Sequence, residues 1–167
     1  KLRWIDTENL EKKKNVKEEF SDIHGVLIPG GFGNRGIEGK ILSSQYAREN
    51  NIPFFGICLG MQCAVIDYAR NKCNMKNANS SEFDKKTSYP VIDIMSDQKD
   101  ITHKGASMRL GSYRCDLNKK TKASQAYKKE QINERHRHRY EFNNKYMDDM
   151  LDKGLIVSGV NEELNLV

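Results

Sequence analysis

Residues 52–70 of the chain read IPFFGICLGMQCAVIDYAR. The first seven of them, residues 52–58, form an apolar run that predicts a buried strand. Residues 59–70 carry apolar side chains almost all round, which predicts a helix in the middle of a domain. The two elements meet in the segment GICLG, residues 56–60, so Cys58 stands between two glycines at a strand-to-helix junction.

The sequence before this segment shows the same order of elements. Residues 23–29 form another short apolar run, and it ends in a glycine-rich turn at residues 30–33. Residues 37–50 then follow as a loosely amphipathic helix. Strand, helix, strand and helix in succession predict a parallel sheet with helices on its faces.

The remaining sequence predicts three more regular elements between polar stretches. The elements are a strand at 89–95, a helix at 141–153 followed by Gly154, and a strand at 155–159. Loops are expected at 71–88, 96–104 and 118–129, and residues 1–6 are expected to form a strand cut from a longer chain. We therefore expect residues 1–167 to form one domain of the α/β class, three-layered and flavodoxin-like, with a mostly parallel central sheet.

The amino-acid composition disfavours a membrane protein and a nucleic-acid-binding protein. The 167 residues are 37% hydrophobic, carry a net charge of +5, and have a mean hydropathy of −0.77. No apolar run approaches the roughly 20 residues that span a bilayer, and no signal peptide is present, so we expect no membrane partner. Acidic residues are interleaved with most lysines and arginines, which favours a solvated surface over a nucleic-acid site. Four cysteines without a C-x-x-C pair favour reduced thiols and a cytoplasmic protein.

Cys58 is the strongest candidate for chemistry. A nucleophile on a tight turn requires small neighbours, and the start of the following helix directs N–H groups toward the sulfur. This arrangement predicts a lowered thiol pKa and a reactive thiolate. The alternative is an inert core cysteine, since free cysteines are often buried.

The glycine-rich turn after the first predicted strand, PGGFG at residues 29–33, is a second candidate. Glycines at the carboxyl end of a parallel strand let backbone N–H groups approach a ligand. The spacing fits neither G-x-G-x-x-G nor a G-K-[ST] loop, which disfavours a nucleotide site. Beside Cys58, the turn would form one wall of an oxyanion hole.

Residues 134–141, ERHRHRYE, alternate arginine with histidine. Such a stretch can be a basic stripe for nucleic acid, a metal site or a clamp for a carboxylate. Arginines between the histidines would repel a cation, so no metal is expected here. A planar guanidinium that grips a carboxylate is the natural use of arginine.

Taken together, these motifs resemble the glutaminase domain of the CTP synthase family, a class I glutamine amidotransferase. The resemblance spans nearly the whole chain, and the matching segments occur in the same order. They are PGGFGNRG at 29–36, GICLGMQ at 56–62, NANSSEF at 77–83, MRLG at 108–111 and RHRHRYE at 135–141. The fold that the resemblance implies is that of class I amidotransferases, with its C-terminal part missing from residues 1–167.

The resemblance also implies roles for particular residues. Cys58 would attack the side-chain amide of L-glutamine, release ammonia and form a glutamyl thioester. The backbone N–H groups of Gly31 and Leu59 would form the oxyanion hole. Glutamine would be held by Gly31, Leu59, Gln62, Glu82 and Arg139.

By the same resemblance, the domain itself needs no cofactor. Its ammonia would pass to an N-terminal synthase domain that uses ATP and Mg²⁺ to aminate UTP, with GTP as an allosteric activator. The full enzyme would be a homotetramer assembled through that synthase domain.

The sequence departs from the family in two places. The family's general base is a His oriented by a Glu in a His-Pro-Glu motif, and no His of this sequence (His24, His103, His136 or His138) stands in such a motif. We therefore expect the 167 residues alone to be inactive or nearly so. Residues 105–107 read GAS where the family has Gly-Gly-Thr.

Three alternatives remain at this level. One is the glutaminase domain of another amidotransferase such as GMP synthase, although residues 135–140 argue against it. Another is a basic nucleic-acid-binding module in which Cys58 is structural, and the third is a domain that binds glutamine without hydrolysing it.

Overall fold

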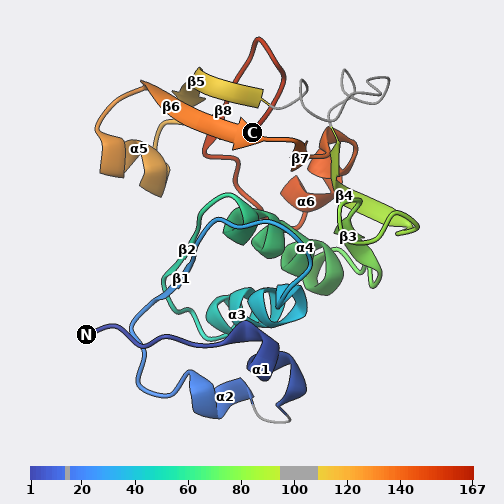
Figure 1. Cartoon of the computed structure of the whole chain (residues 1–167). Helices are drawn as coiled ribbons and strands as arrows, with labels where there is room; N and C mark the ends of the chain where they lie inside the picture. The colour runs from blue at the N-terminus through green and yellow to red at the C-terminus, as the bar shows by residue number, and fades with distance from the viewer. Residues whose placement is uncertain (14–15, 95–108) are drawn as a thin grey trace.

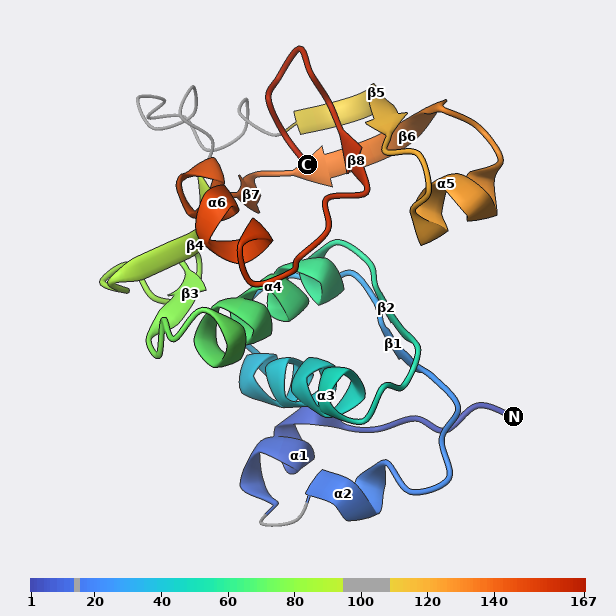
Figure 2. The ribbon, with the colours of Figure 1, turned by 180° about the vertical axis from the view of Figure 1, so that it is seen from behind.

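A computed structural model describes residues 1–13, 16–94 and 109–167 (Figure 1). The helices and short strands form two connected halves, seen from opposite sides in Figures 1 and 2. One half contains α1 (Thr7–Lys12), α2 (Val16–Glu19), β1 (Val26–Ile28), α3 (Ile37–Glu49), β2 (Phe54–Gly56) and α4 (Leu59–Lys72). The other contains β3 (Ala78–Ser80), β4 (Tyr89–Ile94), β5 (Arg109–Leu117), α5 (Lys122–Tyr127), β6 (Gln131–His138), β7 (Tyr140–Phe142), η2 (Asn144–Tyr146), α6 (Met147–Leu151) and β8 (Gly159–Val160).

The predicted strand–helix order at residues 23–70 is confirmed. β1 and β2 pair in parallel, with Val26 opposite Phe54 and Ile28 opposite Gly56. The helices α3 and α4 pack on each other and on both strands. The parallel strands β1 and β2 are connected through the helix α3, which is the arrangement that defines the α/β class.

The helix α4 lies at the centre of the molecule, as its apolar surface predicts. It contacts α3, β1 and β2 on one side and β3, β4, β7 and α6 on the other. Its side chains Cys63, Ile66 and Ala69 are completely buried. They belong to a core that continues through Val91 and Ile92 of β4.

The second half is more antiparallel than the sequence suggests. β3 and β4 are parallel, but β7 joins β4 in the antiparallel direction. β5 and β6 form a long antiparallel hairpin, and β8 pairs with the end of β5. This half builds the wall of the pocket described below.

Several predictions about local structure are wrong. Residues 1–6 form no strand, the polar stretch 71–88 contains β3, and the stretch 118–129 contains α5, whose first turn is capped by the Thr121 hydroxyl. The helix expected at 141–153 is reduced to η2 and α6, because β7 pairs with β4 and the Asn143 side chain caps the turn that follows. Only Gly159 of the strand expected at 155–159 lies in a strand, β8.

Other predictions fall outside the described residues. They concern residue 95 at the end of the predicted strand, the loop at 96–104 with His103, the GAS segment at 105–107, and Met108. Among the described residues, no helix is long and apolar enough to cross a membrane.

Candidate active site

Cys58 sits on a strained turn between β2 and α4. Its backbone angles are φ 53° and ψ −108°, a conformation that costs a non-glycine residue about 1–3 kcal/mol. A Cβ atom at Gly56 would lie 2.5 Å from the carbonyl carbon of Gly60, and one at Gly60 would lie 2.2 Å from the carbonyl oxygen of Ile28. Gly56 is therefore required for β2 to approach the start of α4, and Gly60 for α4 to approach β1.

The sulfur of Cys58 accepts hydrogen bonds from the backbone N–H groups of Leu59 and Gly31. These are the two N–H groups expected to form an oxyanion hole. The glycine-rich turn approaches closely, since a Cβ at Gly30 would lie 3.4 Å from that of Cys58. Two backbone donors thus converge on one side of the thiol, where negative charge on a nearby oxygen would also be stabilised.

The predicted lowering of the thiol pKa is wrong. Burial raises the pKa of Cys58 above its ordinary value and outweighs the two backbone N–H groups, which lower it. The negative charges of Glu141 and Glu82 raise it further. In this structure the thiol form is therefore favoured, and a proton acceptor is needed to generate the thiolate.

The Cys58 side chain opens into a pocket of about 310 Å³. Of the residues expected to act there, Gly31, Cys58, Gln62, Glu82 and Arg139 line the pocket, and Leu59 contributes its N–H from beneath. Four further residues line the pocket and lie within the predicted motifs without having been assigned a role there: Phe32, Arg137, His138 and Tyr140. The pocket therefore unites the glycine-rich turn, the start of α4, the segment after β3 and the junction of β6 with β7.

An acidic and a basic side chain, Glu82 and Arg139, line this pocket together. The Glu82 carboxylate accepts a hydrogen bond from the Gly33 N–H and feels the positive charge of Arg139. Burial raises the pKa of Glu82, and both of these interactions oppose that rise. A carboxylate and a guanidinium on one pocket wall match the ammonium and carboxylate groups of an amino acid.

Gln62 lines the pocket and also forms a hydrogen bond within the pocket wall. Its side chain is 6% exposed, and its Nε2 donates a hydrogen bond of 3.0 Å to the Tyr140 carbonyl oxygen. The central helix α4 is thereby connected directly to the junction of β6 and β7.

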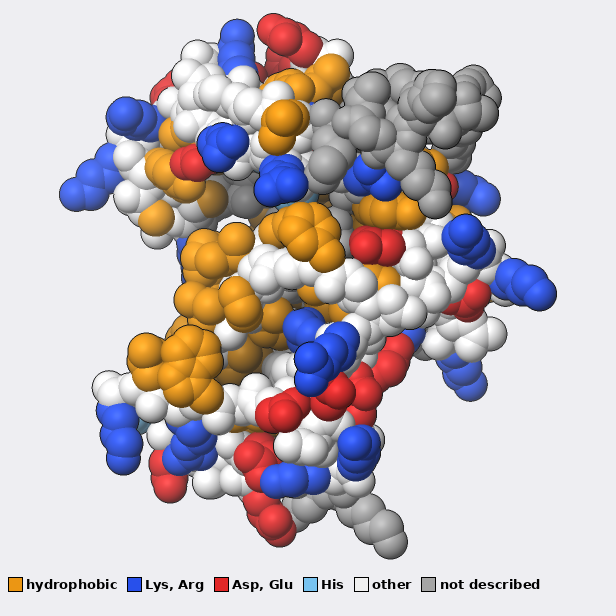
Figure 3. Space-filling model, viewed as in Figure 1, with side chains coloured by type: hydrophobic (Ala, Val, Ile, Leu, Met, Phe, Trp, Pro, Cys, Tyr) orange, Lys and Arg blue, Asp and Glu red, His pale blue; other side chains and the backbone are white. Residues whose placement is uncertain are grey.

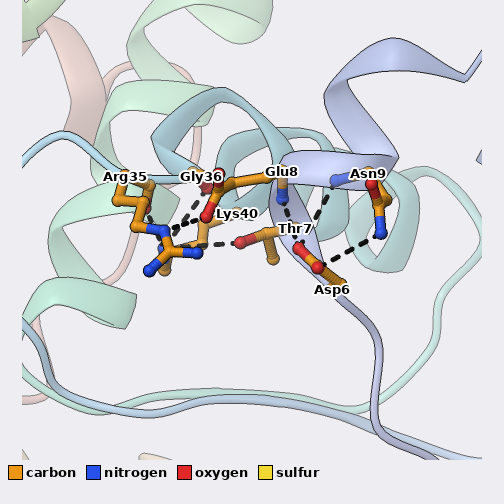
Figure 4. A network of polar contacts seen from close by, with 7 residues as sticks. All are labelled: Asp6, Thr7, Glu8, Asn9, Arg35, Gly36 and Lys40. Atoms are coloured by element: carbon orange, nitrogen blue, oxygen red, sulfur yellow. Dashed lines mark hydrogen bonds and ion pairs between the residues drawn. The ribbon is translucent and has the colours of Figure 1, made fainter.

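The far end of the glycine-rich turn is held by α1 (Figure 4). Lys40 donates hydrogen bonds to the carbonyl oxygens of Arg35, at 2.7 Å, and Gly36, at 3.3 Å, while Arg35 pairs with Glu8. Gly36 has φ +64°, and a Cβ there would lie 2.2 Å from the Thr7 hydroxyl oxygen. Side chains of α1 and α3 therefore anchor the chain where it leaves the turn that carries Gly31.

Behind the pocket lies a buried polar cluster that the sequence analysis did not anticipate. Arg109 and Glu141 are 5% exposed each, and Arg109 Nε lies 3.1 Å from Glu141 Oε1. Arg109 Nη2 lies 2.6 Å from His136 Nδ1, and His138 Nδ1 lies 3.7 Å from Glu141 Oε1. Both residues of the ion pair occur in segments that carry the resemblance, but 32 positions separate them, so the sequence offers no signal of their contact.

The described side chains on the face shown in Figure 3 include charges of both signs. On the face shown in Figure 3, aspartates and glutamates lie among the lysines and arginines. Within the described ranges, no group of three or more His, Cys, Asp or Glu side chains could hold a metal ion.

Comparison with known proteins agrees with this geometry. The model of the family "Glutamine amidotransferase class-I" matches residues 1–166. The chain belongs to the class I glutamine amidotransferases, and its fold is theirs.

Its relatives within that family are more specific. Proteins named CTP synthase from Clostridium acetobutylicum and Chloroherpeton thalassium are 57% and 56% identical to it over 166 and 168 residues. These alignments cover 99% and 100% of this chain but only 31% and 30% of the relatives, so the chain spans about a third of their length. The solved glutaminase domain of Trypanosoma brucei CTPS, with bound acivicin, superposes with a TM-score of 0.87 at 41% identity, covering 96% of this chain and 61% of that one.

Proposed function

We propose that the chain is the glutaminase part of a CTP synthase and that it hydrolyses L-glutamine through a thioester on Cys58. The observation that carries the proposal is the pocket itself. It combines a cysteine on a strained turn, two backbone N–H groups at its sulfur, and an acidic and a basic side chain suited to an amino acid. The binding of acivicin, a glutamine analogue, to the similar Trypanosoma brucei domain supports the same substrate.

In the first half of the reaction, the Cys58 sulfur attacks the side-chain amide carbon of glutamine. A C–S bond forms, and the electron pair of the C=O bond moves onto the oxygen. In this proposal the N–H groups of Gly31 and Leu59 stabilise the oxyanion, and their closeness to the attacking Cys58 sulfur supports that role. When the C=O bond re-forms, the C–N bond breaks, and the nitrogen leaves as ammonia after taking up the thiol proton.

In the second half, water adds to the thioester carbon and the C–S bond breaks. Glutamate leaves, and the sulfur regains a proton, so the cysteine is restored and no redox change occurs. By resemblance to the family, the proton transfers belong to a His of a His-Pro-Glu motif, which the 167 residues do not contain.

Recognition of the substrate rests on Glu82 and Arg139. The Glu82 carboxylate would receive the α-ammonium group, and the Arg139 guanidinium would receive the α-carboxylate. Because these two groups line one pocket and attract each other, a zwitterion can replace their mutual attraction with two new ion pairs.

The fate of the ammonia lies beyond this domain. We propose that it passes to a synthase domain of the same polypeptide, which uses ATP and Mg²⁺ to convert UTP to CTP under activation by GTP, in a homotetramer. That the chain spans only about a third of its relatives supports a second functional part.

The test uses 6-diazo-5-oxo-L-norleucine, an electrophile with the α-amino and α-carboxylate groups of glutamine, on the natural full-length polypeptide. Peptide mass spectrometry should find one adduct, on Cys58. Cys73 and Cys115, which are also partly exposed, serve as internal controls and should stay unmodified. Modification of all accessible cysteines at similar rates, or of none in a folded protein, would contradict a preformed glutamine site.

A further inference from the structure

The two antiparallel regions of the second half meet at the pocket through a single residue. β6 ends at His138 and β7 begins at Tyr140, so Arg139 alone lies between them. β6 belongs to the sheet β6-β5-β8, whereas β7 belongs to the sheet β3-β4-β7. We call residues 138–140 the corner, and all three line the pocket that contains Cys58.

The Arg109–Glu141 ion pair spans this corner on its buried side. Arg109 begins β5 and lies opposite His138 in the β5–β6 ladder. Glu141 lies in β7, opposite Asp93 of β4. The contact of 3.1 Å between Arg109 Nε and Glu141 Oε1 therefore joins one sheet to the other across Arg139.

The residues around the ion pair restrict the orientation of the Arg109 guanidinium. His136 Nδ1 accepts from Arg109 Nη2, because a guanidinium can only donate, and the Arg109 guanidinium also lies 5.2 Å from the centre of the Tyr113 ring. The guanidinium is thus hydrogen-bonded to His136 and lies beside the Tyr113 ring, while Glu141 attracts it as an ion pair in which Arg109 Nε and Glu141 Oε1 make no hydrogen bond. A side chain fixed in this way specifies an angle between two sheets more tightly than a flexible ammonium would.

We propose that Arg109 and Glu141 form a positioning pair that fixes the corner, and thereby fixes where the Arg139 guanidinium meets the α-carboxylate of the substrate. This inference rests on the proposed function, since it assigns the pair a purpose in glutamine recognition. Neither residue lines the pocket, so the pair acts on Arg139 through the backbone of the corner, in addition to the effect of the Glu141 charge on the pKa of Cys58. The hydrogen bond from Gln62 Nε2 to the Tyr140 carbonyl holds the same corner from the side of α4.

The test compares two reagents on the natural full-length polypeptide. 6-Diazo-5-oxo-L-norleucine must bind in the pocket through its α-amino and α-carboxylate groups before it reacts with Cys58. Iodoacetamide needs only access to the thiol. The rate constants for modification of Cys58 are measured for the wild type, Glu141→Gln and Arg109→Lys. The matched control is Asp67→Asn, since Asp67 is another buried carboxylate, 1% exposed and paired with Arg48 at 2.9 Å, but lies between α3 and α4.

For Glu141→Gln, the ratio of the diazo-ketone rate to the iodoacetamide rate should fall roughly tenfold to hundredfold, the effect typical of a misplaced clamp. Arg109→Lys keeps both charges, so the same ratio of rates should also fall in this variant, but by a smaller factor. Asp67→Asn should keep the wild-type ratio even if its melting temperature drops. The Arg109→Lys variant also carries the test if Glu141→Gln does not fold.

The outcomes separate the two proposals. If the wild type is not modified by the diazo-ketone while iodoacetamide reacts, the proposed function fails. If the wild type is modified by both, but the ratio in the Arg109 and Glu141 variants stays at the wild-type value, the positioning pair is refuted. An equal loss of both rates would also refute it, because the pair would then act on the thiol rather than on recognition.

Discussion

Replacing Glu141 with glutamine should change how the stability of the fold depends on pH. Burial raises the pKa of Glu141 from its ordinary 4.5 to about 7, and the charge of Arg109 opposes that rise. Because the folded pKa is the higher one, the contribution of this group to stability is present below pH 4.5 and is lost as the pH rises through 7. The gap between 4.5 and about 7 corresponds to about 3 kcal/mol of unfolding free energy.

His138 should produce the opposite dependence. Burial, then the charges of His136 and Arg109, lower its pKa from 6.5 to about 4. Its contribution to stability is therefore present above pH 6.5 and is lost as the pH falls through 4. This gap also corresponds to about 3 kcal/mol, so the two groups nearly cancel between pH 4 and 7.

The assay is urea denaturation of the wild type, Glu141→Gln and His138→Asn at closely spaced pH values, with unfolding followed by circular dichroism. Relative to the wild type, the unfolding free energy of Glu141→Gln should rise by about 3 kcal/mol from pH 4 to 7, and that of His138→Asn should fall by about as much. The attraction between Arg109 and the Glu141 carboxylate is already part of the Glu141 pKa of about 7, so its loss in Glu141→Gln adds no separate pH dependence. Parallel curves for the wild type and Glu141→Gln would refute the reasoning.

Two further predictions concern the turn that carries Cys58. Gly60→Ala places a methyl group 2.2 Å from the Ile28 carbonyl oxygen, so α4 must move away from β1. Thermal denaturation should show that the free energy of unfolding falls by about 2 kcal/mol. The rate at which iodoacetamide modifies Cys58 should also differ from that of the wild type. Cys58→Gly removes a Cβ from a backbone at φ 53°, so this variant should be about 1 kcal/mol more stable than Cys58→Ala in urea.

Each of these predictions has its own control. Gly25→Ala meets its nearest atom, the Pro53 carbonyl oxygen, only at 3.4 Å and should leave Cys58 unaffected. Equal effects of Gly60→Ala and Gly25→Ala would mean that the close approach of α4 to β1 is not essential. If Cys58→Gly and Cys58→Ala proved equally stable, the turn would store no strain at this position.

The part of the site that depends on local order could be predicted from the sequence. The turn at Cys58 is specified by the glycines at 56 and 60, and both packing requirements occur where the pattern places them. The pKa of the Cys58 thiol could not be predicted in the same way. A helix start favours a thiolate, but burial, which depends on the whole fold, acts in the opposite direction and is larger.

The far wall of the pocket could not be derived from periodicity. β5 and β6 alternate between exposed and partly buried positions, but the partly buried positions include Gly111, His136 and His138, so the sequence shows no apolar alternation there. The Arg109–Glu141 pair joins strands that are 32 positions apart, and no local pattern encodes such a contact. The resemblance named Glu82 and Arg139 correctly as pocket residues, whereas their roles in binding glutamine remain a proposal.

The central claim is that Cys58 forms a covalent bond to the substrate. The most direct measurement is the intact mass of the natural full-length polypeptide, mixed with L-glutamine and quenched in acid within milliseconds, followed by peptide mapping. We predict a population heavier by one glutamyl group, with the modification on Cys58 alone and absent from Cys58→Ala. Release of ammonia from glutamine without any such adduct, or with equal rates in Cys58→Ala, would contradict the account.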